Sequence, residues 1–136
     1  MKILAERIIE YLKTDNTLVN LLDSSNNIFI ASAPVDKEKF VIIGTMVGDD
    51  NNAIPVDTGT LDIIVGVKRK VQDAHSLCLQ IADRVDYLLN KQEPNLTAGS
   101  WKILNFVRKD SAGLQFDNDA EEFWYPLTYE FIIENQ

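Results

Sequence analysis

The sequence feature that most constrains the fold is a long apolar stripe with helical spacing in the second half of the chain. Eight small or apolar residues recur three or four positions apart, as they do on one face of an α-helix. They are Ala74, Leu77, Cys78, Ile81, Ala82, Val85, Leu88 and Leu89. The positions between them hold polar residues such as Asp83 and Arg84. We therefore predict a helix over about residues 72–90 that buries one face against a sheet.

The rest of the hydrophobic pattern predicts that sheet and a helical N-terminus. Residues 4–12 repeat apolar side chains with helical spacing, and residues 18–22 indicate a further short helix capped by Asp15 or Asn16. Alternating or continuous apolar runs predict strands. The predicted strands cover residues 28–30, 40–43, 61–67, 101–107, 114–116 and 123–133. Residues 48–58 are rich in turn-forming residues and are predicted to be a loop.

The order of these elements, with helices and strands in separate runs, is typical of an α+β fold. We expect residues 1–136 to form a single domain. Its sheet is predicted to be mixed and mostly antiparallel, with about four to five strands and two main helices on one face. Pro126 has no amide hydrogen, so the last strand is expected to lie at a sheet edge or to be bulged there.

The predicted last strand has apolar side chains on both of its faces. Its odd-numbered positions, from Phe123 to Ile133, point to one face, whereas Trp124, Pro126 and Ile132 point to the other. Two helices cannot cover both faces of such a sheet. We therefore expect a homo-oligomer in which the second apolar face is shared between copies.

Composition excludes several classes of protein. The chain has 136 residues and a formal net charge of −8, from 13 Lys and Arg against 21 Asp and Glu, which disfavours binding to nucleic acid through its phosphates. Cys78 is the single cysteine, so no disulfide forms within the chain, and no apolar run is long enough to cross a membrane. The N-terminal residues do not resemble a signal peptide. We expect a protein that acts in or assembles in the reducing cytoplasm.

The charge is unevenly distributed along the chain. Residues 66–109 hold eight basic and four acidic side chains, whereas residues 110–136 hold seven acidic and no basic ones. Opposite charge blocks of this kind can set the register between two copies that meet head to tail. We expect the positive block of one copy to face the negative block of the next.

Three residues invite a catalytic interpretation that their context does not support. The run from Asp57 to Thr60 contains the Asp-Thr-Gly of aspartic proteases but lacks the apolar strand that should precede it. His75, the only histidine, is predicted to lie on the polar side of the long helix, and Cys78 lies on its apolar stripe as a buried small residue. We expect no catalytic residues.

Residues 117–122 alternate oxygen-bearing side chains as calcium loops do. They lack the glycine at the sixth position and the acidic residue at the twelfth that an EF-hand needs. An acidic hairpin turn is the better interpretation. We expect neither a metal nor a cofactor.

The order of elements and several segments resemble a known family. Residues 39–44 read Lys-Phe-Val-Ile-Ile-Gly, residues 61–67 read Leu-Asp-Ile-Ile-Val-Gly-Val, and residues 81–85 read Ile-Ala-Asp-Arg-Val. Residues 101–107, the Asp-Ser-Ala-Gly at 110–113 and the closing strand follow in the same order. Together they are similar to the tail-terminator or tail-completion proteins of long-tailed bacteriophages, over essentially the whole chain.

This resemblance implies a structural role in a virion. Such proteins form a hexameric ring on the head-proximal end of the tail tube, stop tube polymerisation, and offer a surface to the head–tail connector protein. The implied partners are other copies of the chain, the tail tube protein and the connector, with no membrane. The alternatives are another neck or tail-tube component and, from a different class, a dimeric aspartic hydrolase that uses Asp57.

The predicted contact between copies is formed by residues 123–133 and the outer face of the long helix. Residues 48–58 and 117–122 are expected to be exposed and are the candidates for contact with the tail tube or the connector. The candidate interface residues are Lys68, Arg69, Lys70, Asp117, Asp119, Glu121, Glu122, Trp124, Tyr125, Tyr129, Asp49 and Asp50.

Overall fold

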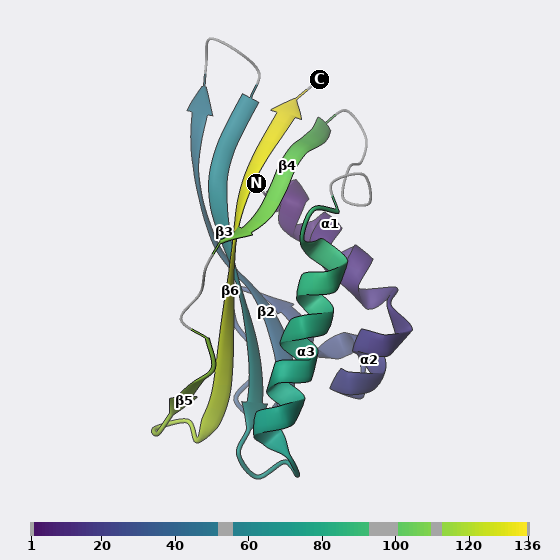
Figure 1. Cartoon of the computed structure of the whole chain (residues 1–136), viewed down its shortest axis with the longest axis vertical. Coiled ribbons are helices and arrows are strands. Elements are labelled where there is room, and N and C mark those ends of the chain that lie inside the picture. Colours follow the sequence, from purple (N-terminus) through teal and green to yellow (C-terminus); the bar gives the residue numbers. More distant parts are fainter. Residues whose placement is uncertain (1, 52–55, 93–100, 110–112, 136) are drawn as a thin grey trace.

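One mixed sheet with a helical layer on one of its faces makes up the computed structural model (Figure 1). The structure describes residues 2–51, 56–92, 101–109 and 113–135. The helices are α1 (Lys2–Lys13), α2 (Asn16–Leu22) and α3 (Ala74–Leu89), with a short 3-10 turn η1 (Ser25–Asn27). The strands are β1 (Ile28–Ile30), β2 (Lys39–Asn51), β3 (Val56–Lys68), β4 (Trp101–Lys109), β5 (Gln115–Asp117) and β6 (Glu122–Asn135).

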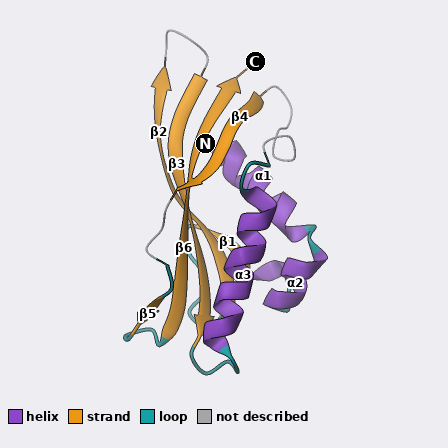
Figure 2. Cartoon of the chain, in the orientation of Figure 1, coloured by secondary structure: helices purple, strands orange, loops and turns teal. Residues whose placement is uncertain are grey.

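The strands form a single sheet in the order β1-β2-β3-β6-β4, and β5 pairs with the same edge of β6 as β4 does. Only the β1–β2 pair is parallel among these. The described helices α1, α2 and α3 lie on the same side of the sheet (Figure 2). The predicted α+β class is therefore confirmed, with six strands in place of four to five.

The α3 helix is the element that the sequence predicted best. It begins at Ala74 and ends at Leu89, and seven residues of its apolar stripe are buried, with Leu77 half-buried. The stripe faces β3 and β6 and belongs to the same buried core as Leu61, Ile63 and Val65 of β3 and Leu127 of β6. Burial of such side chains stabilises the fold by about 1.5–3 kcal/mol each in gross terms, so this contact is a main source of stability.

The N-terminal helices follow the predicted pattern and are joined by the predicted cap. Asp15 has extended backbone angles, and its carboxylate accepts a hydrogen bond from the Leu18 amide at 2.8 Å. That bond satisfies one of the free amides at the start of α2. The carboxylate also accepts two hydrogen bonds from Arg84 of α3, which joins the two helices.

The predicted loop over residues 48–58 is wrong where the structure describes it. Residues 48–51 continue β2 and residues 56–58 belong to β3, while residues 52–55 lie outside the described part of the chain. The two strands pair without interruption from Met46↔Leu61 to Asn51↔Val56, and β6 pairs along the whole of β3. Pairing with neighbours on the sheet overrides the low strand propensity of Gly, Asn and Asp.

In Figure 1 the distal parts of β2 and β3 extend beyond the helical layer, at the end of the sheet opposite β5. The β2–β3 register shifts between Ile43 and Met46, next to Gly44. A Cβ atom on Gly44 would lie 2.9 Å from the Asp62 carbonyl oxygen, so glycine permits this close approach of the two strands.

The last strand is central in the sheet, although it is locally an edge at Pro126. The β3 strand pairs with β6 along its length, including Ile64↔Pro126. On the other side, β5 pairs with residues 122–124 and β4 with residues 128–135, which leaves a gap around Pro126. Pro126 therefore needs no amide hydrogen there, because neither β4 nor β5 pairs with it, and β6 as a whole need not lie at the edge of the sheet.

Candidate functional site

The sheet face that points away from the helices has an apolar centre, as the alternation of β6 predicted. The register places Phe40, Gly66 and Trp124 in one row across β2, β3 and β6, and Ile42, Ile64 and Pro126 in the next. The Phe40 ring lies against Gly66, where a Cβ atom would meet ring carbons at 2.2 Å and 2.4 Å. A glycine thus provides the space for an aromatic side chain that covers part of this face.

The segment over residues 31–37 folds back along this face and encloses a hollow of about 350 Å³. Most of its lining is apolar, with Pro34 and Val35 on one side and Phe40, Ile64 and Trp124 on the sheet. Val35 is 90% exposed. Partly covered apolar faces of this kind are common where a partner binds, so we take this hollow as the candidate site and call it the sheet-face hollow.

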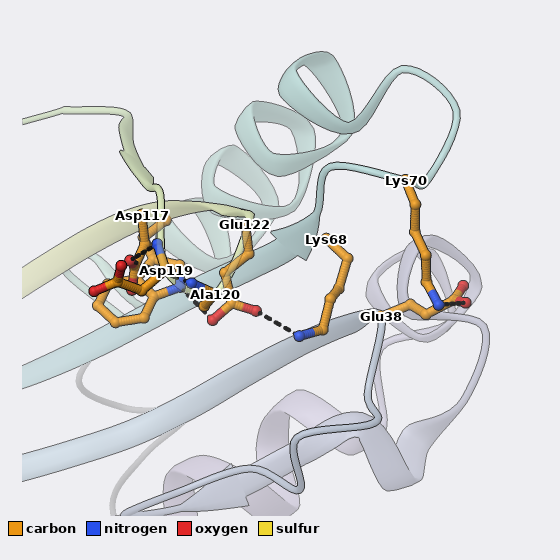
Figure 3. Close-up of polar contacts among 8 residues, drawn as sticks. Glu38, Lys68, Lys70, Asp117, Asp119, Ala120 and Glu122 are labelled. Carbon is orange, nitrogen blue, oxygen red and sulfur yellow. Dashed lines mark hydrogen bonds and ion pairs between the residues drawn. The ribbon is translucent and has the colours of Figure 1, made fainter.

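A polar chain runs along one wall of the sheet-face hollow. Glu122 is only 7% exposed, and its two oxygens have different partners. Oε1 accepts a hydrogen bond from Trp124 Nε1 at 2.9 Å, and Oε2 lies 3.3 Å from Lys68 Nζ. Figure 3 shows Lys68 and Glu122 facing each other from β3 and β6. The ion pair with Lys68 fixes the Glu122 carboxylate, because breaking the pair would leave a buried charge without its partner. The fixed carboxylate in turn holds the Trp124 indole through its hydrogen bond.

Some residues of the two charge blocks that were predicted to meet between copies also meet within one chain. Arg69 Nη2 lies 4.0 Å from Glu121 Oε1, and the Arg69 amide donates to the Glu121 carbonyl oxygen at 2.9 Å. Lys70 Nζ lies 3.2 Å from Glu38 Oε1 (Figure 3). Antiparallel pairing brings the ends of β3 and β6 together, so Lys68 and Arg69 each have an acidic neighbour in their own chain. Head-to-tail matching between copies through Lys68, Arg69 and Lys70 stays a prediction.

The acidic residues of the β5–β6 turn form a hairpin turn, as predicted. Asp117 Oδ1 accepts hydrogen bonds from the amides of Asp119 and Ala120, at 3.0 Å and 3.4 Å. A second hollow of about 450 Å³ lies beside this turn and shares Trp124 with the sheet-face hollow. Within the described residues, no three His, Cys, Asp or Glu side chains are arranged to hold a metal ion.

Both of the predicted interface tyrosines, Tyr125 and Tyr129, face the helical layer and not a free surface. Tyr129 is fully buried, and its hydroxyl donates to Asp86 Oδ1 of α3 at 2.9 Å. Tyr125 is half-buried, and its hydroxyl accepts a hydrogen bond from Arg108 at 3.2 Å. Arg108 also lies 3.3 Å from Asp86. These residues attach α3 to β4 and β6, so the prediction of Tyr129 as an interface residue is wrong.

Asp49 and Asp50 lie at the other end of the sheet, where they pair with Thr58 and Asp57. Asp57 and Gly59 therefore belong to a regular strand that is paired on both sides. An aspartic protease instead needs its aspartate in a loop, where a second such aspartate can share a proton. The backbone geometry disfavours the hydrolase alternative.

The remaining two candidates for chemistry lie where the helical pattern placed them. His75 is exposed near the start of α3, and its ring meets Phe123 edge to face at 5.8 Å. Cys78 is buried, and burial raises the pKa of its thiol to about 12. A thiol with such a pKa is a poor nucleophile near neutral pH.

The part that residues 31–37 and Phe40 play in the site was not predicted from the sequence. The hollow forms because residues 31–37 fold back over the sheet. The spacing of apolar residues in the sequence does not indicate such a fold-back. The available signal was Gly66 within the apolar run of residues 63–67, because a glycine inside a strand indicates a close neighbour. Identifying Phe40 as that neighbour required the β2–β3 register.

The sequence matches no family model and no curated protein. Among solved structures, the fold is similar to a chain of the "Virion of native gene transfer agent (GTA) particle", with a TM-score of 0.77. The two are 13% identical in sequence, and the match covers 96% of this chain and 94% of the other. At that identity the likeness establishes a shared fold over nearly the whole length of both chains. In the described part of the chain, no helix is long and apolar enough to cross a membrane.

Proposed function

We propose that the protein is a structural component of a phage-like virion and acts as a tail terminator. In that role it forms a ring at the head-proximal end of the tail tube, ends tube polymerisation and provides the surface to which the head–tail connector protein binds. The observation that carries the proposal is the shared fold with a chain of a gene transfer agent virion, because it spans 96% of this chain.

Two further observations support a role through association rather than catalysis. The sheet-face hollow has mostly apolar walls, and Val35 beside it is 90% exposed, which suits a protein partner. The candidate nucleophile Cys78 is buried with a raised thiol pKa. The ring and its head-proximal position on the tail are parts of the proposal that rest on the resemblance of the sequence to tail-terminator proteins.

Electron microscopy of the purified protein, alone and mixed with purified tail tubes, tests the proposal. We expect rings of about six subunits, as the family resemblance implies, and a cap on one end of each tube. A protein that polymerises into tubes by itself would be a tube component. A stable monomer that leaves the tubes uncapped would contradict any role at the tube end.

The hydrolase alternative has its own measurement. A dimeric aspartic hydrolase would cleave a peptide substrate at acid pH and lose that activity in Asp57→Asn. We expect no such cleavage from either protein.

A further inference from the structure

Two parts of the chain complement each other but lie at opposite ends of the sheet. The first is the distal hairpin formed by residues 46–51 of β2 and 56–60 of β3, which we call the hairpin arm. The second is the sheet-face hollow, between residues 31–37 and the start of β2. From Phe40 to Asn51 the strand covers 11 residue steps, or about 35 Å at about 3.3 Å per residue. The arm therefore cannot reach the hollow of its own chain.

The arm has the composition of a segment that binds elsewhere. It contains Asp49, Asp50 and Asp57 and no Lys or Arg, and Met46, Val47 and Val56 supply apolar side chains. The β1 strand pairs only with residues 41–43 of β2. Beyond that point, β3 is the only described strand that pairs with β2, so one edge of the arm is open to a partner.

The hollow has the complementary character. Its lining is mostly apolar and includes two ammonium groups, those of Lys37 and Lys68, against one carboxylate, Glu122. Lys68 Nζ has three N–H donors, and Glu122 is the only described partner of that ammonium. An acidic segment with apolar side chains fits such a surface in both charge and hydropathy.

We propose that the hairpin arm of one copy binds the sheet-face hollow of the next copy. This inference rests on the proposed function, because a contact between two different surfaces repeats from copy to copy and produces a ring when the rotation closes. It also assigns each copy one donor end and one acceptor end.

Disulfide trapping between copies tests this contact. The variants Asp49→Cys in the arm and Val35→Cys beside the hollow are mixed in equal amounts, with or without tail tubes, and oxidised mildly. The native Cys78 does not interfere, because it is buried in the core. We expect a disulfide-linked dimer on a non-reducing gel, and a ladder up to the ring size when both substitutions are in the same chain.

Tyr87→Cys provides the matched control, since Tyr87 is 69% exposed on α3 in the helical layer. Asp49→Cys should form little or no dimer with it. Rings that are visible by electron microscopy but give no Asp49–Val35 link, or an equal link to Tyr87→Cys, would overturn the arm contact and leave the tail-terminator proposal intact. The absence of both rings and links would overturn both.

Charge reversal in the arm tests the electrostatic part of the proposal. Asp49→Lys with Asp50→Lys should raise the concentration at which rings form by at least about tenfold. The control, Glu10→Lys with Asp83→Lys, makes the same change in charge at exposed positions of α1 and α3. Equal effects of the two pairs would show that net charge and not the arm is responsible.

Discussion

The carboxylate of Asp15 accepts two hydrogen bonds from the guanidinium of Arg84, at 2.9 Å and 2.7 Å, across 69 positions of sequence. The same carboxylate accepts the Leu18 amide at the start of α2. One side chain therefore caps a helix and fixes that helix to α3. A bidentate pair of this kind specifies geometry as well as attraction.

Replacing Asp15 with Ala should destabilise the protein by about 1–2 kcal/mol, the upper part of the range for the loss of an N-cap, because Arg84 loses its partner as well. Urea unfolding followed by circular dichroism measures the difference. The matched control is Arg69→Gln, which breaks a 4.0 Å ion pair between two largely exposed side chains. We expect that control to change stability by less than about 0.5 kcal/mol. Equal losses of stability in the two variants would mean that the Asp15 cap stabilises the protein no more than an exposed ion pair does.

Stability should also fall in acid through Asp15. The Arg84 hydrogen bond holds the pKa of this carboxyl below its ordinary value of 3.8, with the Leu18 amide contributing in the same direction. A carboxyl whose pKa is lower in the folded state stabilises the fold above its unfolded pKa, and this contribution is lost as the pH falls through the folded pKa.

The melting temperature should therefore drop below about pH 4, and the drop should be smaller in Asp15→Asn, which keeps a capping side chain but has no charge to titrate. Thermal unfolding over a series of acidic buffers measures both profiles. Asp83→Asn, on the exposed side of α3, should follow the wild-type profile. An unchanged profile in Asp15→Asn would contradict this role.

Gly66→Ala should destabilise the sheet face by about 1–3 kcal/mol, the usual cost of overpacking. The added Cβ would overlap the Phe40 ring, whose nearest carbon would be 2.2 Å away. In a Phe40→Ala background the same substitution should cost little, so the two changes should be strongly non-additive. A double-mutant cycle from urea unfolding measures the coupling, and additive effects would mean that the ring does not lie against Gly66.

Lys68→Gln should cost about 2 kcal/mol, because it leaves the buried Glu122 carboxylate without its cationic partner. Lys70→Gln is the matched control, since its side chain is 69% exposed and its ion pair with Glu38 lies on the surface. Tryptophan fluorescence should report the first change and not the second, because Trp124 donates to Glu122. Similar unfolding and fluorescence for both variants would contradict the buried-pair interpretation.

Local patterns allowed a large part of this fold to be predicted. The spacing from Ala74 to Leu89 depends only on the helical repeat, so it indicated both the helix and its buried face. The Asp15 cap, the buried Cys78 and the apolar second face of β6 were likewise visible, because each depends on residues close together in sequence.

What the sequence determined by itself was therefore the identity of the elements and the faces they bury, since propensity and periodicity act over a few residues. The tertiary structure decided which elements meet. The strand register brought Lys68 to Glu122 within one chain, placed Phe40 over Gly66 and made residues 48–51 part of a long hairpin. Such pairings depend on the free energy of contacts between distant segments, which no local pattern contains.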